Sequence, residues 1–308
     1  MNLELSYQID EYVKSRHYRL LNSVLIFQGD EIIFERYYNN CNETSRHNIK
    51  SIWKSIISVC CGIAIDKGFI KNVDEPICTY LPIFDGRNNS FHPLITVKHL
   101  LTMSSGIYWN GGVKYHCPML EQFNRTKDHL AFLADVKMSA LPGTEFIYKE
   151  WDIIILTAVI SAATGMHCFD FCNKYLYQPL EIESGKWFTF SDGLCYNIGT
   201  TLAEQNTSNL SARDLAKIGL LFKKGGKWNG KQIVSEKYIF EALTPFNPGY
   251  GYLWWIYPDG YGCSGYGGQQ IKVIPDQNIV YVLQASVLNS NRDYSDVIDL
   301  ILQKRQQI

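Results

Sequence analysis

Ser51 and Lys54 form the one Ser-x-x-Lys motif in this 308-residue chain. Residues three apart share one face of a helix, so the Ser51 hydroxyl and the Lys54 amine can meet. Serine is a weak nucleophile and needs a basic neighbour to react with a carbonyl carbon. The predicted helix is apolar nearly all round, and such surroundings favour the neutral amine, which can accept a proton. This spacing therefore indicates nucleophilic chemistry at Ser51.

The motif alone also has an unremarkable interpretation. Average residue usage gives about one Ser-x-x-Lys by chance in a chain of this length. The position of Lys54 inside an otherwise apolar predicted helix favours the catalytic interpretation, because lysines are almost never fully buried without a reason. The surrounding elements therefore have to decide between the two interpretations.

Hydrophobic patterning predicts strands near both ends of the chain, with helices between them. Apolar and β-branched runs indicate strands at residues 23–28, 31–37, 250–256, 269–274 and 279–285. Helices are predicted at residues 9–20, 51–67, 97–103, 127–135, 151–164, 168–176, 210–223 and 293–303. Strands at both chain ends suggest a single sheet assembled from both termini. We predict an α/β domain from residues 1–71 and 207–308, and a mostly helical inserted domain at 72–206.

Composition excludes several classes of protein. Hydrophobic residues make up 46% of the chain and charged residues 19%, which excludes a disordered chain. The formal net charge of −1, with no basic cluster, argues against nucleic-acid binding. The apolar runs are too short to span a bilayer. With no signal-like pattern at the first residues, we expect a cytoplasmic protein whose nine cysteines are reduced thiols.

Ten short sequence motifs follow one another along the chain in the order that is typical of a known protein family. The chain resembles the serine β-lactamase and penicillin-binding-protein superfamily, and within it the class C β-lactamase-like branch of esterases, D-amino-acid peptidases and 6-aminohexanoate-dimer hydrolase. These motifs lie at residues 47–68, 73–76, 80–82, 95–106, 141–148, 179–180, 211–217, 228–231, 265–269 and 273–275. The resemblance implies an α+β fold, an α/β sandwich whose antiparallel sheet of about five strands is flanked by helices, with an all-helical region inserted.

The resemblance also implies roles for individual residues. Ser51 matches the nucleophile that is acylated, Lys54 matches the lysine of its proton network, and Tyr148 matches the tyrosine proposed as a base. A phenol needs a nearby cation to act as a phenolate at neutral pH, and Lys54 can supply it. The backbone N–H groups of Ser51 and Tyr266 match the oxyanion hole, which contributes several kcal/mol in typical enzymes. No metal or cofactor is implied.

Two positions depart from the family pattern and affect the expected substrate. Glu150 stands where the second motif usually has asparagine; it either holds Lys54 protonated or points outward to Lys149 and solvent. In the third motif, Cys263-Ser264-Gly265 replaces the usual Lys-Thr-Gly or His-x-Gly, so the cation that attracts a substrate carboxylate is missing. We expect Glu150 and residues 263–266 to contact substrate, with Gly265 allowing a ligand to approach the backbone.

The expected function is a serine hydrolase acting on a small-molecule ester or amide. β-Lactamase or D-Ala-D-Ala-type carboxypeptidase activity is one alternative. A second is a catalytically impaired ligand-binding protein on the same scaffold, in which Glu150 locks Lys54 in an ion pair. His116-Cys117 and His167-Cys168 with Cys172 do not form a zinc pattern. The oligomeric state stays open.

Overall fold

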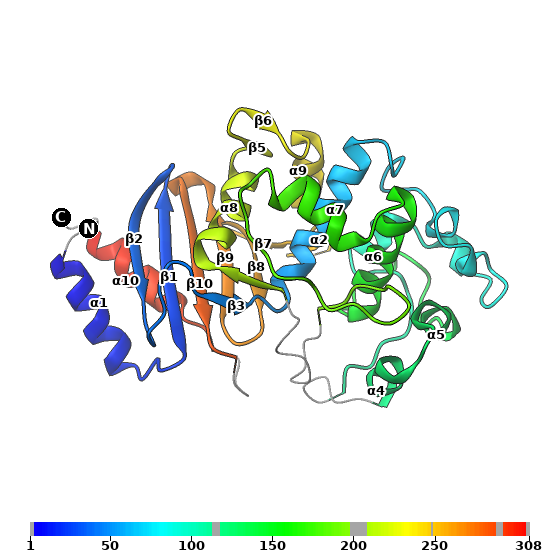
Figure 1. Ribbon diagram of the computed structural model, residues 1–308, viewed down its shortest axis with the longest axis horizontal. Coiled ribbons are helices and arrows are strands. Elements are labelled where there is room, and N and C mark those ends of the chain that lie inside the picture. Colours follow the sequence, from blue (N-terminus) through cyan, green and yellow to red (C-terminus); the bar gives the residue numbers. More distant parts are fainter. Residues whose placement is uncertain (1–2, 113–117, 198–207, 248, 288–291, 306–308) are drawn as a thin grey trace. The chain divides into compact units, whose positions relative to one another are not determined.

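The computed structural model describes residues 3–112, 118–197, 208–247, 249–287 and 292–305 of the chain. Within these ranges it contains a six-stranded antiparallel sheet and a set of helices (Figure 1). The chain divides into two compact units. Unit 1 comprises Met1–Ile52, Ser208–Lys224 and Tyr257–Ile308, and unit 2 comprises Trp53–Thr207 and Gly225–Ile256. The units are defined by how compactly their residues pack and not by domain boundaries. The α/β domain at 1–71 and 207–308 and the inserted domain at 72–206 therefore stay a prediction.

The sheet has the strand order β2-β1-β10-β9-β8-β7, with the N-terminal hairpin joined to the C-terminal strands through β1 and β10. The expected single sheet from both chain ends is therefore confirmed, with six strands where about five were predicted. The strands are β1 (Leu21–Gln28), β2 (Glu31–Tyr37), β7 (Trp255–Tyr257), β8 (Gly260–Gly265), β9 (Gln269–Ile274) and β10 (Ile279–Ala285).

Both faces of the sheet in unit 1 are covered, which explains why the first six residues of β1 (Leu21–Gln28) are all buried. Helices α1 (Leu3–Ser15) and α10 (Ser295–Arg305) lie side by side along one face (Figure 1). Their apolar residues pack with alternate residues of the central strands, namely Leu5, Ile9, Val13, Val24, Ile26, Tyr281, Leu283, Val297, Ile298 and Ile301. Helix α8 (Ala212–Lys223) packs against β10 and β9.

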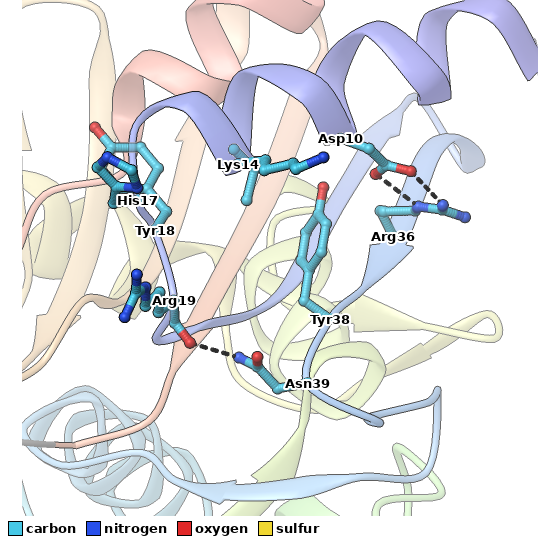
Figure 2. Close-up of a pocket in the computed structure, with 9 residues that line it drawn as sticks. Asp10, Lys14, His17, Tyr18, Arg19, Arg36, Tyr38 and Asn39 are labelled. Atoms are coloured by element: carbon cyan, nitrogen blue, oxygen red, sulfur yellow. Dashed lines mark hydrogen bonds and ion pairs between the residues drawn. The ribbon is translucent and has the colours of Figure 1, made fainter.

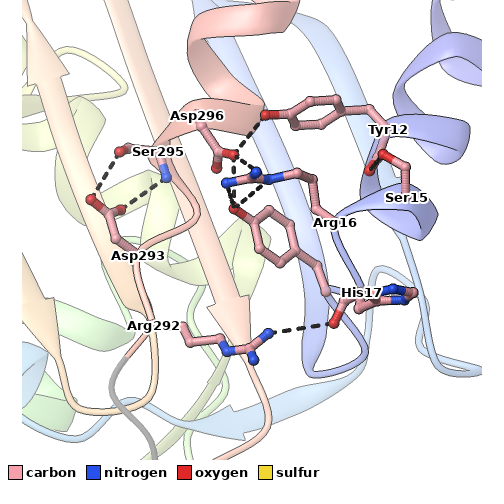
Figure 3. A network of polar contacts seen from close by, with 9 residues as sticks. Tyr12, Ser15, Arg16, His17, Arg292, Asp293, Ser295 and Asp296 are labelled. Atoms are coloured by element: carbon pink, nitrogen blue, oxygen red, sulfur yellow. Dashed lines mark hydrogen bonds and ion pairs between the residues drawn. The ribbon is translucent and has the colours of Figure 1, made fainter.

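A polar network fastens the two outer helices to each other. The hydroxyls of Tyr12 in α1 and Tyr18 each donate a hydrogen bond of 2.7 Å to Oδ2 of Asp296 in α10, and Nε of Arg16 lies 3.5 Å from the same oxygen (Figure 3). The Asp296 hydrogen bond is the main cause of a raised pKa at Tyr12. The network joins α1 and the residues just after it to α10, although Tyr12 and Tyr18 lie 284 and 278 residues from Asp296 in the sequence.

Unit 2 is mostly helical. Its longest helices are α2 (Ile52–Asp66, of which Ile52 belongs to unit 1) and α6 (Glu150–Thr164), and both are buried along most of their length. The remaining helices are α3 (Val97–Leu101), α4 (Pro118–Arg125), α5 (His129–Asp135), α7 (Cys168–Cys172), the π-helical turn Asn173–Tyr177 and α9 (Glu236–Leu243). Short strand pairs are β3 (Arg46–Asn48) with β4 (Asn209–Ser211), in unit 1, and β5 (Lys227–Trp228) with β6 (Lys231–Gln232).

The structure corrects two sequence-based predictions of strands. The predicted strand at residues 250–256 is a series of bends, and the strand β7 begins only at Trp255. Strand β8 was not predicted, because three of its six residues are glycines, which weaken strand propensity. At Gly260 and Gly262 an added Cβ would lie 2.0 and 2.3 Å from carbonyl oxygens of β9, so close strand approach requires these glycines.

Candidate active site

Ser51 lies in the turn that immediately precedes α2. Two hydrogen bonds in unit 1 set this turn: the Ile49 N–H donates to the Ser208 carbonyl at 3.1 Å, and the Lys50 N–H donates to the side-chain Oδ1 of Asn48 at 2.9 Å. Lys50 has a φ of +50°, a left-handed conformation that costs a non-glycine residue about 1 kcal/mol or more. A strained residue directly before Ser51 is held in place by these flanking bonds.

The end of strand β8 packs directly against the segment that leads to Ser51. A Cβ added to Gly265 would lie 2.4 Å from the Ile49 carbonyl oxygen and 3.0 Å from the Lys50 Cβ. We expected this glycine to let a ligand approach, but in the structure its close neighbour is protein backbone. Gly265 directly precedes Tyr266, and Lys50 directly precedes Ser51. The contact between Gly265 and Lys50 therefore joins the two segments that carry the predicted oxyanion-hole N–H groups.

The other two residues of the third motif have different surroundings in unit 1. Cys263 is 2% exposed and pairs with Ile271 of β9. Ser264 is half-buried and hydrogen-bonds with the side chain of Tyr257, whose pKa is raised mainly by burial. A thiol and a hydroxyl stand where the family motif has a cation.

Lys54 and Glu150 form a buried ion pair in unit 2. The Lys54 Nζ lies 2.8 Å from Glu150 Oε1, and the two side chains are 4% and 6% exposed. Lys54 is the third residue of α2 and Glu150 is the first of α6, where a carboxylate also interacts favourably with the helix dipole. Of the two orientations that the sequence left open for Glu150, the structure has the one directed at Lys54.

Tyr148 completes this cluster. Its ring centroid lies 5.2 Å from the Lys54 Nζ, so the ammonium contacts the ring face as well as the carboxylate. Trp255 stacks on Tyr148, with ring centroids 5.9 Å apart at an interplanar angle of 23°, and meets Tyr250 edge-to-face, with centroids 4.7 Å apart. Phe146 lies 5.0 Å from Tyr250. The phenol therefore has a cation on one side and an aromatic wall on another.

The sequence analysis missed a second buried ionic cluster beside this one. Lys149 donates to the Ile107 carbonyl at 3.1 Å and lies 3.7 Å from Asp152 Oδ1. Asp152, fully buried, accepts bonds from the Ser105 hydroxyl at 2.5 Å and from the Ser105 N–H at 3.2 Å. Burial raises the pKa of Asp152. A lysine and an aspartate three apart at the start of an apolar helix were the available signal.

The aromatic residues Trp254, Trp255 and Tyr261 differ in burial. Trp254 is fully buried. Trp255 is half-buried and contacts Tyr148. Tyr261 is 9% exposed within β8, and burial raises its pKa.

A cavity of about 520 Å³ in unit 1 contains none of the predicted site residues. It lies between α1 and the end of β2 and is lined by Asp10, Val13, Lys14, His17, Tyr18, Arg19, Arg36, Tyr38 and Asn39 (Figure 2). Arg36 and Asp10 form a bidentate pair at its edge. Across the described parts of the chain, no three His, Cys, Asp or Glu side chains are grouped so as to hold a metal ion. His116 and Cys117 lie outside the described residues.

The sequence matches the model of a known protein family. The family model described as Beta-lactamase matches residues 9–306, nearly the whole sequence. The chain belongs to the β-lactamase family. The resemblance drawn from the motifs is therefore confirmed.

Relatives within the β-lactamase family include hydrolases. The 6-aminohexanoate-dimer hydrolase of Paenarthrobacter ureafaciens is 24% identical over 234 residues, which cover 72% of this chain and 57% of the relative. Esterase EstB of Burkholderia gladioli is 26% identical over 184 residues, covering 54% of this chain and 46% of the relative. These relationships and the family assignment support a hydrolase.

Solved structures show the same fold. A putative 6-aminohexanoate-dimer hydrolase from Bacillus anthracis aligns with a TM-score of 0.75 at 19% identity, covering 96% of this chain and 80% of that one. The octameric penicillin-binding protein homologue from Pyrococcus abyssi aligns with a TM-score of 0.73 at 21% identity, covering 99% and 78%. The predicted β-lactamase and transpeptidase-like architecture is confirmed.

Among the described residues no single helix is both long and apolar enough to cross a bilayer. One pair, Glu150–Thr164 with Cys168–Tyr177, meets the length and composition criteria together but is bent by 75°.

Proposed function

We propose that this β-lactamase-family hydrolase cleaves small-molecule esters or amides through an acyl-enzyme on Ser51, with Lys54 and Tyr148 as acid and base partners. One observation carries the proposal: three residues after Ser51, a buried lysine contacts both a carboxylate and the ring of Tyr148. A buried cation with two such partners is a charge arrangement typical of functional sites.

The ion pair favours Tyr148 over Lys54 as the base. Glu150, at 2.8 Å, favours the protonated form of Lys54, so that the amine is a cation rather than a proton acceptor. Lys54, as a cation 5.2 Å from the centroid of the Tyr148 ring, would stabilise the negative charge that Tyr148 must carry to take up a proton from Ser51. In the proposed acylation the phenolate takes the Ser51 proton, Oγ attacks the carbonyl carbon, and the phenol then protonates the leaving group. In deacylation Tyr148 activates a water molecule in the same way.

The oxyanion formed in both steps needs hydrogen-bond donors. We assign this role to the backbone N–H groups of Ser51 and Tyr266. The close packing of Gly265 on Ile49 and Lys50 supports the assignment, because it fixes the two donor-bearing segments against each other within unit 1. Ser264 and Tyr266, which are both half-buried, would then lie at the substrate-facing edge.

The same positions favour esters and uncharged amides as substrates. The Cys263 thiol and Ser264 hydroxyl offer no cation for a substrate carboxylate, and the carboxylate of Glu150 would repel the carbonyl oxygen of the side-chain amide that β-lactams carry. β-Lactams and D-Ala-D-Ala peptides carry a carboxylate that a motif cation would normally attract, so β-lactamase or carboxypeptidase activity is the weaker candidate. We expect short-chain esters to be cleaved faster than a cephalosporin; the reverse order would support the β-lactamase assignment.

Turnover of p-nitrophenyl esters tests the catalytic assignment. We expect the wild type to be active, Ser51→Ala and Tyr148→Phe to lose at least about 100-fold in kcat/KM, and the exposed variant Tyr7→Phe to match the wild type. Activity that survives Ser51→Ala would contradict the proposal.

The Lys54–Glu150 pair also supports a second candidate, a ligand-binding protein without turnover. In that case the pair would lock Lys54 and block catalysis. Glu150→Asn restores the residue usual in the family and distinguishes the two. An inactive wild type with an active Glu150→Asn variant would indicate the impaired, binding form; an active wild type excludes it.

A further inference from the structure

The segment that carries Tyr148 is anchored on both sides to the loop after α3. The Ile147 N–H donates to the Met103 carbonyl at 3.0 Å, and the Lys149 ammonium donates to the Ile107 carbonyl at 3.1 Å. Tyr148 itself is half-buried and lies between these two anchors in the chain. The place of its phenol therefore depends on how firmly the loop holds the residues on either side.

The loop after α3 is itself held in place. Met103 has a φ of +54°, a left-handed conformation that a non-glycine residue keeps only where its surroundings fix it. Gly106 has a φ of +78°, and a Cβ added there would lie 2.2 Å from the Ala140 carbonyl oxygen. The Gly106 carbonyl also accepts from the Ser139 N–H at 2.8 Å. A loop fixed in this way is a suitable support for a side chain that has to be placed accurately.

Four buried residues form a closed ring of contacts between this loop and the start of α6. Lys149 Nζ lies 3.7 Å from Asp152 Oδ1, and the two side chains are 1% and 0% exposed. The Ser105 hydroxyl donates to Asp152 Oδ1 at 2.5 Å and accepts from the Ile107 N–H at 3.2 Å. The Ile107 carbonyl then accepts from Lys149, which closes the ring. Because these contacts are buried, water cannot replace one that is lost.

The same ring affects the charge beside Glu150. Two cations and two carboxylates are buried in this part of unit 2, and they pair as Lys54 with Glu150 at 2.8 Å and Lys149 with Asp152 at 3.7 Å. Removing one partner of such a pair leaves an uncompensated buried charge. A neutral residue in place of Asp152 would leave Lys149 as a cation directly next to Glu150 in the chain. Two lysines would then compete for one carboxylate.

We propose that Asp152 is a positioning residue for the hydrolase reaction. Its ring of contacts holds Tyr148 in place, and its charge satisfies Lys149 and so leaves Glu150 to Lys54. The inference rests on the function proposed above, in which Lys54 acts as a cation and its carboxylate partner keeps it protonated as the pH rises. Asp152 touches none of the reacting groups in that account, so it affects catalysis only through the residues it orients.

Asp152→Asn tests both effects, because the amide oxygen can still accept from Ser105 while the charge is lost. We expect kcat for p-nitrophenyl acetate, counted per site that a fluorophosphonate titrates, to fall about tenfold or more with little change in KM. We also expect the basic limb of the pH–rate profile to move down by about half a pH unit or more, because Lys54 loses part of its carboxylate partner. Asp170→Asn, at an exposed aspartate in the first turn of α7, is the matched control and should behave as the wild type.

Two further variants separate charge from packing. Adding Lys149→Met to Asp152→Asn removes the competing cation, and replacing both partners of a buried pair by neutral groups is often tolerated. We expect the basic limb of this double variant to return to its wild-type position, while kcat stays low because the bond to the Ile107 carbonyl is gone. Ser105→Ala keeps both charges and removes the hydroxyl link, so kcat should fall and the basic limb should stay where it is.

The outcomes distinguish this inference from the function on which it rests. A wild type without Ser51-dependent turnover would overturn both. An active wild type whose kcat and pH profile are kept in Asp152→Asn would overturn the inference alone, and a basic limb that stays shifted in the double variant would refute the role of the charge. Should Asp152→Asn fail to fold, Ser105→Ala and the double variant decide, because a wild-type kcat in either contradicts the positioning role.

Discussion

The Lys54–Glu150 pair is the feature at residue scale on which the proposed chemistry depends. Removing one partner of a buried ion pair leaves the other charge uncompensated in a low-dielectric site. The same geometry explains how a lysine can lie in a helix that is otherwise apolar. It also places a cation, the Lys54 ammonium, beside the ring of Tyr148.

The first prediction concerns this pair. Glu150→Gln keeps the shape of the side chain and removes its charge, so we expect the free energy of unfolding to fall by about 3 kcal/mol. Glu121→Gln is the matched control, because Glu121 pairs with Arg125 at 4.0 Å on the exposed surface of α4. We expect that variant to change stability by less than about 0.5 kcal/mol. Chemical denaturation measures both, and equal effects of the two variants would argue against a charged buried pair.

Sequence could define the residues of the candidate site better than their partners. Ser51, Lys54 and Tyr148 followed from motif spacing and the family resemblance. The direction of Glu150 could not be predicted, because Lys149 and Lys54 were both available partners. The structure resolves the choice through Asp152, which pairs with Lys149 and leaves Glu150 to Lys54. A contact between α2 and α6 is a tertiary fact that local spacing does not contain.

At the scale of elements, strand β8 is the main example of what periodicity missed. Glycine lowers strand propensity, and yet Gly260, Gly262 and Gly265 are each required by a backbone neighbour closer than 2.5 Å to a hypothetical Cβ. Helix α9 (Glu236–Leu243) was also missed, although Ser235 caps it by accepting from the Tyr238 N–H. Long apolar helices such as α2 and α6 were predicted to within one residue at each end. Their runs of apolar residues reflect burial of the side chains, which the sequence shows directly, whereas close approach of two backbone segments leaves no such run.

The second prediction follows from the packing of β8 on the segment before Ser51. Gly265→Ala places a methyl group 2.4 Å from the Ile49 carbonyl oxygen, so a backbone segment must move. We expect a loss of about 2 kcal/mol in stability and a fall in ester turnover. Gly185→Ala is the control, because nothing lies within 4 Å of its hypothetical Cβ. Unchanged melting and activity in Gly265→Ala would contradict the close packing.

The third prediction concerns the link between β2 and α8 and its pH dependence. Arg213 Nε and Nη2 donate to Glu35 at 2.7 and 2.9 Å, and this hydrogen bonding lowers the pKa of Glu35 from its ordinary value of 4.5. A lowered carboxyl pKa gives stability that is present above the unfolded-state pKa and is lost as pH falls through the folded-state pKa.

Glu35→Gln should therefore cost up to about 1 kcal/mol at pH 7, after allowance for solvent screening. The difference from the wild type should shrink steadily as pH falls below about 4.5. Urea denaturation between pH 3 and pH 7 measures it, with Glu31→Gln, an exposed residue on the same strand, as control. A difference that persists undiminished at the lowest pH would assign the effect to packing rather than charge.

For the whole molecule, the fold and the family are established while the substrate is proposed. Strands from both chain ends close one sheet, and the family model spans residues 9–306. Relatives in this family bear names as different as esterase and aminohexanoate-dimer hydrolase, so the fold does not select the substrate. The residues that replace the family's usual asparagine and lysine or histidine carry the selection that we propose.

The identity of the nucleophile is the claim on which the rest of the functional account depends. Incubation of the wild-type chain with a fluorophosphonate, followed by digestion and tandem mass spectrometry, tests it directly. The account predicts one phosphonyl adduct on the peptide that contains Ser51, and none on Ser51→Ala. Labelling of another residue, or ester turnover by a chain that forms no Ser51 adduct, would contradict it.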